Sequence, residues 1–159
     1  SVRDRKQLRL SVNGQGVSDN LLIIWDAKAT IGEDYGMDGK KFNGNEDVGF
    51  YSLQLDNQYA ITALPLKWEE SSMLQLGLDL SQPGNYQIKV DEFKQLEEDQ
   101  VILLFDKEAG IYHDLHETKS ISIEVSTGLS QSQRFQLIYG SASVHDTGVV
   151  THLVESDLE

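Results

Sequence analysis

The stretch Leu74-Gln-Leu76-Gly-Leu78-Asp-Leu80 decides the fold class of this chain, because leucine recurs in it at every second position. Side chains at alternate positions of a β-strand point to opposite faces of the sheet. The leucines therefore share one face, while glutamine, glycine and aspartate share the other. This pattern predicts a strand with one face buried in a core and the other face turned to solvent.

Other segments repeat this alternation, or are short apolar runs bounded by turn residues. Leu21–Trp25 and Val101–Phe105 are continuously apolar, which predicts strands covered on both faces. The remaining expected strands are Leu8–Val12, Phe50–Leu55, Tyr59–Leu64, Asn85–Val90, Ile111–Asp114, Ser120–Val125 and Arg134–Tyr139. About nine or ten short strands predict an all-β sandwich or barrel, and we favour an antiparallel, jelly-roll-like β-sandwich.

Turn residues separate the expected strands. Asp56-Asn57 and Asp106–Gly110 predict hairpin loops, and Gln82-Pro83-Gly84-Asn85 predicts a tight turn. A short edge strand is expected near Lys40–Phe42. Helical spacing is confined to Phe93 and Leu96 and is too short to favour a helix. The expected core contains Leu10, Ile23, Leu53, Ile61, Leu76, Leu78, Ile88, Leu103, Ile123, Phe135 and Leu137.

Length and charge bound the classes of function. We expect residues 8–140 to form one domain, 1–7 a linker, and 141–159 a linker or loosely docked tail. The 26 acidic and 13 basic residues give a net charge of −13, which repels phosphate backbones and anionic lipid. No apolar run reaches the roughly 20 residues that span a bilayer. We therefore expect neither nucleic-acid binding nor membrane insertion. Cysteine is absent, which excludes thiol and disulfide chemistry.

A series of short motifs along the chain resembles a known family. The motifs are Leu8-Arg9-Leu10, Asp19 before LLIIW, Ala27-Lys-Ala-Thr30, Gly32-Glu33-Asp34-Tyr35, Asp38-Gly39-Lys40-Lys41, Pro83-Gly84-x-Tyr86, Asp106, Asp114-Leu115 and Arg134-Phe135-x-Leu137. Their order is similar to the β-sandwich domain that precedes the C-terminal sorting signal in type IX-secreted surface proteins of the Bacteroidetes. Here Gly32-Glu33-Asp34 replaces that family's aromatic–aspartate pair, and the sorting signal itself is not in the sequence.

The resemblance implies a non-catalytic accessory module, extracellular or on the outer cell surface. Such a module is a folded spacer or an adhesion-type interaction domain of a larger protein. Its partners are neighbouring domains of the parent protein, and a surface glycan or protein ligand. The polar Ser1–Gln7 contains no secretion signal, so we expect either a cytosolic protein or, as the resemblance favours, a piece of a longer chain.

An acidic, glycine-rich segment is a candidate calcium site. Glu33, Asp34 and Asp38, with Glu46 and Asp47 behind them, offer the oxygen ligands that Ca²⁺ takes in sets of roughly six to eight. The spacing does not match an EF-hand. The alternative is a solvated loop whose aspartates make turn hydrogen bonds. Calcium is the one cofactor that the sequence suggests.

Aromatic residues suggest a second binding mode. Trp68, Tyr35 and Tyr112 could offer flat rings on which a sugar stacks, whereas Trp25 ends an apolar strand and is expected in the core. The alternative function is thus a calcium-dependent or carbohydrate-binding module.

Enzymatic and transition-metal interpretations have little support. His113 and His116 are three residues apart and would point to opposite faces of a strand, and no third ligand is evident. The acidic pairs Glu69-Glu70 and Glu97-Glu98 are adjacent residues, which a strand points apart, so they do not form a glycosidase pair. No nucleophile elbow, phosphate loop or HExxH motif occurs. We expect no enzyme activity.

Overall fold

The computed structural model describes residues 5–26, 39–40, 47–54, 57–65, 72–126 and 133–141. These residues contain strands and turns and no helix, which confirms the all-β prediction. The strands are β1 (Lys6–Gly14), β2 (Val17–Asp26), β3 (Gly39–Lys40), β4 (Val48–Gln54), β5 (Asn57–Pro65), β6 (Ser72–Leu80), β7 (Gly84–Lys94), β8 (Gln100–Asp106), β9 (Ile111–Asp114), β10 (Ser120–Val125) and β11 (Phe135–Ser141).

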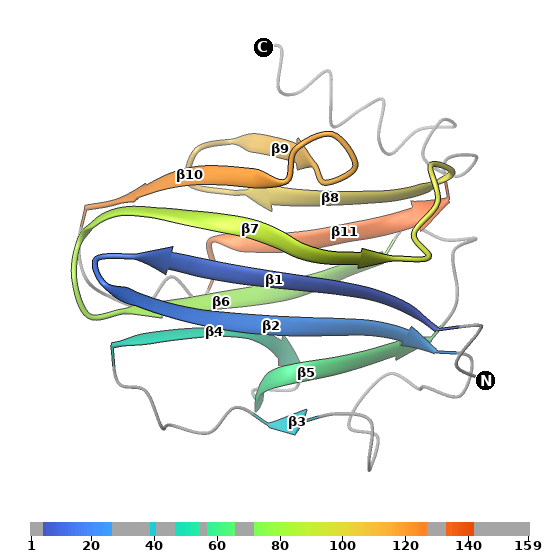
Figure 1. Cartoon of the computed structure of the whole chain (residues 1–159), viewed down its shortest axis with the longest axis horizontal. Coiled ribbons are helices and arrows are strands. Elements are labelled where there is room, and N and C mark those ends of the chain that lie inside the picture. Colours follow the sequence, from blue (N-terminus) through green and yellow to red (C-terminus); the bar gives the residue numbers. More distant parts are fainter. Residues whose placement is uncertain are drawn as a thin grey trace.

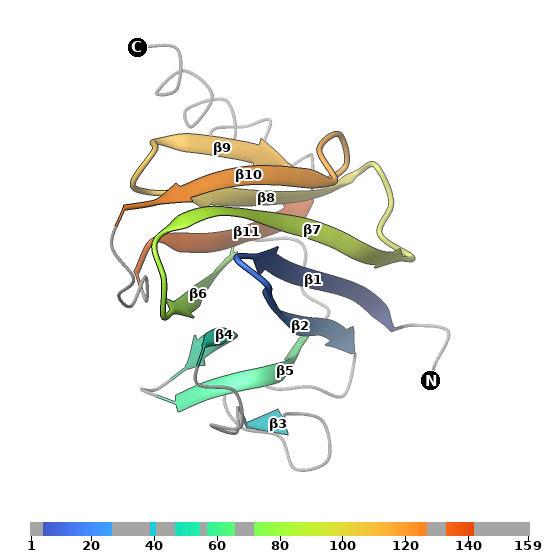
Figure 2. The same ribbon diagram turned by 60° about the vertical axis from the view of Figure 1, so that its left-hand side comes forward.

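The strands form one continuous sheet in the order β10-β7-β1-β2-β5-β4-β6-β11-β8-β9, with β3 paired to β5. The sheet curls over itself and nearly closes into a barrel, so that β7 and β10 lie across the core from β8 and β11 (Figures 1 and 2). All neighbouring pairs are antiparallel except β2 and β5, which run parallel. The expected sandwich of separate antiparallel sheets is therefore replaced by a single mixed sheet.

The parallel pair arises because β5 changes partner along its length. Its first residues pair with β4, where Ser52 lies opposite Tyr59, and its later residues pair with β2 from Ile61 to Pro65. Where β5 leaves β4, a side chain from β2 takes over, since the backbone N–H of Phe50 donates to Oδ2 of Asp19 at 2.8 Å. This bond satisfies a backbone donor that no strand pairs.

The inner face of the curled sheet forms the core. Nine of the expected core residues are buried, namely Leu10, Ile23, Leu76, Leu78, Ile88, Leu103, Ile123, Phe135 and Leu137. Leu53 is only half-buried. The prediction for Ile61 is wrong, because this side chain is 38% exposed. In β5 it is Thr62 and Leu64 that lie beside Ile23 and Trp25 and face inward.

Two polar features complete the interior. The buried hydroxyls of Ser52 and Thr62 bond to each other. Trp25 is fully buried, as predicted, and its ring meets Tyr139 edge-on at 5.4 Å between centroids. The hydroxyl pair satisfies both buried side chains, and the edge-on contact with Tyr139 adds to the apolar burial of the Trp25 ring.

The turns follow the sequence closely. The hairpins between β4 and β5 and between β8 and β9 are confirmed, and Gly110 supplies a φ of +71° at the second. The Pro83-Gly84 turn does not make a hairpin, because β6 and β7 are not paired and the chain crosses from one side of the core to the other. Residues 91–94 continue β7, so the weak helical spacing has no structural counterpart.

Candidate functional site: an amide-lined groove on the outer face

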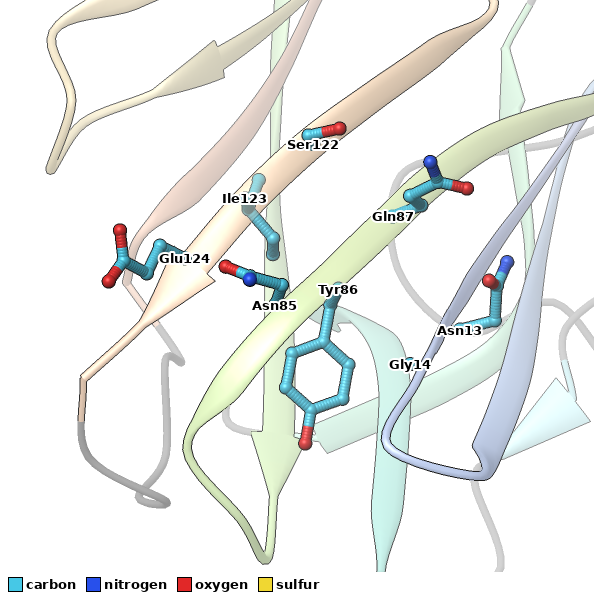
Figure 3. A pocket seen from close by; sticks show the side chains of 8 residues that line it. All are labelled: Asn13, Gly14, Asn85, Tyr86, Gln87, Ser122, Ile123 and Glu124. Atoms are coloured by element: carbon cyan, nitrogen blue, oxygen red, sulfur yellow. The ribbon is translucent and has the colours of Figure 1, made fainter.

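A groove of about 650 Å³ crosses the outer face of the sheet near the ends of β1, β7 and β10. We call it the amide groove. Figure 3 shows the residues that line it: Asn13, Gly14, Asn85, Tyr86, Gln87, Ser122, Ile123 and Glu124. Its polar side chains come from outward-facing positions, while Tyr86 and Ile123 direct their side chains toward the core and are buried.

Strand register brings these side chains together. Gln87 on β7 lies opposite Asn13 on β1 and opposite Ser122 on β10. Asn85 lies opposite Glu124 in the next outward row. Directly opposed residues share a face, and neighbouring strands are about 4.8 Å apart. The groove therefore presents two short rows of polar groups at the spacing of adjacent strands.

The polar lining extends beyond the groove over the same face. Ser11, Lys89 and Ser120 form the next row toward the middle of the strands. Ser18 and Asn20 continue the polar positions on β2. No large apolar side chain on β1, β2, β7 or β10 is exposed, because the exposed large hydrophobic residues of the described chain are Ile61, Met73 and Ile111. This face cannot attract a ligand through apolar burial.

The floor of the groove is held by a close approach between the β1–β2 turn and β7. A Cβ atom on Gly14 would lie 2.6 Å from the carbonyl oxygen of Asn85 and 2.7 Å from Cδ1 of Tyr86. Only glycine allows this contact. The Tyr86 hydroxyl donates to the carbonyl of Gln82 at 2.7 Å, and burial raises the pKa of Tyr86. The tyrosine is thus a neutral, fixed support beneath the groove.

The chemistry of the lining favours recognition over catalysis. Asn and Gln amides each offer two donors and an acceptor oxygen, and the Ser122 hydroxyl can both donate and accept. Glu124 is the only ionisable side chain among the lining residues apart from the buried Tyr86. General acid–base chemistry needs groups poised to exchange protons with a substrate. A set of neutral amides instead suits a ligand that presents many hydroxyl or amide groups.

The aromatic site predicted from the sequence is only partly within the described residues. Tyr112 on β9 stacks on Phe105 of β8, with ring centroids 4.1 Å apart and an angle of 13° between the rings. This pair lies on strands other than those of the amide groove. Trp68 and Tyr35 fall outside the described residues, so the proposed grouping of the three rings stays a prediction.

The predicted calcium residues Glu33, Asp34 and Asp38, together with Glu46, also lie outside the described residues. Asp47 is described and is exposed. It binds Ser81 twice, because its carbonyl accepts from the backbone N–H at 3.0 Å and its Oδ1 accepts from the hydroxyl at 3.3 Å. The part of the chain that the structure describes contains no group of three or more His, Asp or Glu side chains arranged to hold a metal ion.

The two histidines are separated by their packing. The ring of His116 meets Phe93 edge-on at 4.8 Å, and its Nε2 lies 2.6 Å from the carbonyl oxygen of Gln100. Lys119 covers the same phenyl ring, with Nζ 3.6 Å from the centroid, while His113 lies on β9. Loss of solvent lowers the pKa of Lys119, although Asp114 and Glu117 act in the opposite direction. These contacts fix the β9–β10 loop on the end of β7.

Sequence reasoning missed the amide groove. The sequence pattern places the alternating polar residues Asn85-x-Gln87 and Ser122-x-Glu124 only on the solvent-exposed faces of their strands. The signal that could have found them is that three of these four outward positions carry amides or a small hydroxyl, and only Glu124 carries a charge. Their convergence depends on the β7–β10 and β1–β7 registers, which the sequence does not give.

Comparisons with known proteins add a family. Residues 3–139 match the family described as Domain of unknown function (DUF8693). No curated protein and no solved structure matches the chain. In the described residues, no helix has the length and apolar character needed to cross a membrane.

Proposed function

We propose that this chain, which belongs to the DUF8693 domain family, is a non-catalytic recognition module of a larger secreted or cell-surface protein. In this proposal the amide groove is its contact surface. The observation that carries the proposal is the composition of the groove: its outward side chains are three amides, a hydroxyl and a single carboxylate on a supported stretch of sheet. An adhesion-type module needs a rigid face of this kind and no reactive groups.

The proposed ligand is a neutral, hydroxyl-rich molecule, of which an oligosaccharide is the main class. Amide side chains can pair with adjacent hydroxyl groups through donor and acceptor at once. The net charge of −13 and the Glu124 carboxylate disfavour anionic ligands such as nucleic acids or sulfated glycans. This carbohydrate-binding role places the ligand on β1, β7 and β10, and Tyr112 is not part of that surface.

Matched variants test the site. The double variant Asn85→Ala/Gln87→Ala removes two exposed amides from the centre of the groove. Asn20→Ala removes an exposed amide from β2, outside it. On an array of neutral oligosaccharides, we expect wild type and Asn20→Ala to give the same signals and the double variant to lose them. Equal signals from the double variant, or no signal from any protein, would reject the groove as a glycan site.

The extracellular location and the place beside a type IX sorting signal rest on the motif resemblance and are part of the proposal. They are tested by the flanking sequence of the parent gene and by surface labelling of cells that express the full protein. Calcium binding by Glu33, Asp34 and Asp38 is tested separately by calorimetry with CaCl₂. The control is the variant Glu33→Gln/Asp34→Asn/Asp38→Asn. If the wild-type chain gives no heat of binding with CaCl₂, the calcium proposal is rejected.

A further inference from the structure

The curled sheet ends at β10 without closing. Among the described strands, β10 pairs with β7 alone, and β9 at the other end of the sheet pairs with β8 alone. The short segment 115–119 joins these two end strands, and Figure 2 shows them together at the open seam of the barrel. An edge strand carries a row of backbone groups that can pair with another strand.

Printed hydrogen bonds fix which backbone groups of β10 face outward. The Val90 N–H donates to the carbonyl of Lys119 at 2.8 Å, so residue 119 points toward β7. Backbone groups alternate in direction along an antiparallel pair. The groups of Ile121 and Ile123 therefore also face β7, and those of Ser120, Ser122 and Glu124 face away from it.

One contact confirms this direction and limits the open edge. Nη1 of Arg134 donates to the carbonyl of Glu124 at 3.1 Å, from the side opposite β7. The carbonyl of Glu124 is thereby occupied. The N–H and C=O groups of Ser120 and Ser122, and the N–H of Glu124, remain along the edge and bond to no described residue.

The charged side chain of Glu124 is the one device on β10 of the kind that usually protects a sheet edge. Proteins block such edges with proline, lysine, bulges or very short strands. The sequence Ser-Ile-Ser-Ile-Glu-Val of β10 contains no proline or lysine, and its register with β7 is uninterrupted from Ser120 to Val125. The exposed side chains at Ser120 and Ser122 are small, so they leave room for an incoming backbone.

We propose that the open edge of β10 binds an extended, lysine-bearing peptide segment of a partner protein by strand addition. The backbone groups of Ser120, Ser122 and Glu124 supply the hydrogen bonds. The exposed Glu124 carboxylate and the net charge of −13 select a basic segment over an acidic one. Ser122 and Glu124 belong to both this edge and the amide groove, but the edge binds mainly through their main-chain groups, whereas the groove binds through side chains.

The test uses the whole chain and a synthetic peptide of alternating threonine and valine with a lysine at each end. Binding is followed by amide NMR shifts and by calorimetry. We expect the largest shifts at the amides of Ser120, Ser122 and Glu124. Ser122→Pro removes an outward N–H without touching the β7 ladder, and we expect it to weaken binding by about tenfold. Asn85→Ala/Gln87→Ala should bind the peptide normally, which separates this edge from the glycan site.

A second measurement does not depend on how the variant folds. Peptides N-methylated at every second amide come in two sets, and only one set blocks the amides that face β10. We expect one set to lose binding to the wild-type chain and the other to keep it. Equal binding by both sets, shifts confined to other strands, or unchanged binding by Ser122→Pro would overturn the proposal. A dimer of the chain that Ser122→Pro dissociates would also overturn it, with a second copy as the occupant.

Discussion

Arg134 and Asp106 form a buried two-point ion pair, with Nε 2.9 Å from Oδ1 and Nη2 3.0 Å from Oδ2. Both side chains are almost fully buried. The arginine also holds the carbonyl of Glu124 at the end of β10, while Oδ1 of Asp106 accepts the backbone N–H groups of Glu108 and Ala109. This pair therefore ties β8, the β8–β9 hairpin, β10 and β11 together at one end of the barrel.

Removing the arginine should be among the most damaging single changes in the described residues. Arg134→Ala leaves a buried carboxylate without its charged partner, and we expect a loss of about 3–5 kcal/mol in the free energy of unfolding. Urea unfolding followed by circular dichroism measures it. The control is Glu108→Gln, because Glu108 is an exposed partner of the same guanidinium at 3.4 Å and should matter by less than about 1 kcal/mol. Similar losses in both variants would contradict this account.

Gly77 should resist substitution because of the tyrosine opposite it. Gly77 on β6 lies across from Tyr51 on β4, and a Cβ atom on Gly77 would lie 2.2 Å from Cε2 of that buried ring. The Tyr51 hydroxyl donates a hydrogen bond to Oδ1 of Asp79 at 2.9 Å, and this bond limits how far the ring can move. We expect Gly77→Ala to destabilise the chain by about 1–3 kcal/mol.

A double-mutant cycle isolates this contact. In a Tyr51→Ala background the ring is gone, so Gly77→Ala should cost clearly less than it does in wild type. Equal costs in both backgrounds would show that backbone conformation, and not the ring, excludes a side chain at position 77.

Burial makes Tyr139 a late-titrating group. Loss of solvent raises the pKa of Tyr139, and interactions with the side chains of Ser72 and Trp25 only partly offset that effect. Because the pKa of Tyr139 is higher in the folded chain than in the unfolded chain, where it is near 10, folding favours the neutral phenol. The contribution of Tyr139 to the free energy of unfolding is therefore complete below the unfolded pKa and is lost as the pH rises from there through the folded pKa. Absorbance titration at alkaline pH should show late tyrosine steps, and Tyr139→Phe should remove one of them while that of Tyr86 remains. A Tyr139→Phe curve identical to wild type would contradict the assignment.

The sequence predicted the strands well because their signal is local. Alternation such as that of Leu74 to Leu80 reports burial of one face, whatever the partner strand. The errors come from pairing. The mainly apolar segment Tyr59–Leu64 does not indicate which alternate positions face the core, and this is why Ile61 was expected inside. Only the parallel pairing with β2 shows that Thr62 and Leu64 face inward. The continuity of the sheet likewise depends on where β5 leaves β4.

The candidate site was beyond the sequence for the same reason. Asn13 lies far from Gln87 and Ser122 along the chain, and each is an ordinary outward residue of its own strand. Two registers place them in one row. Trp25 was correctly assigned to the core because a run of apolar neighbours precedes it, and a local pattern of that kind is what sequence analysis detects.

The most direct test of the central claim is an amide NMR titration of the whole chain with neutral oligosaccharides, followed by recovery of the sugar after long incubation. We predict shifts that converge on the side-chain amides of Asn13, Asn85 and Gln87, with the oligosaccharide recovered intact. Shifts that map to other strands, or a sugar that is cleaved or modified during incubation, would contradict a recognition module that binds through the amide groove.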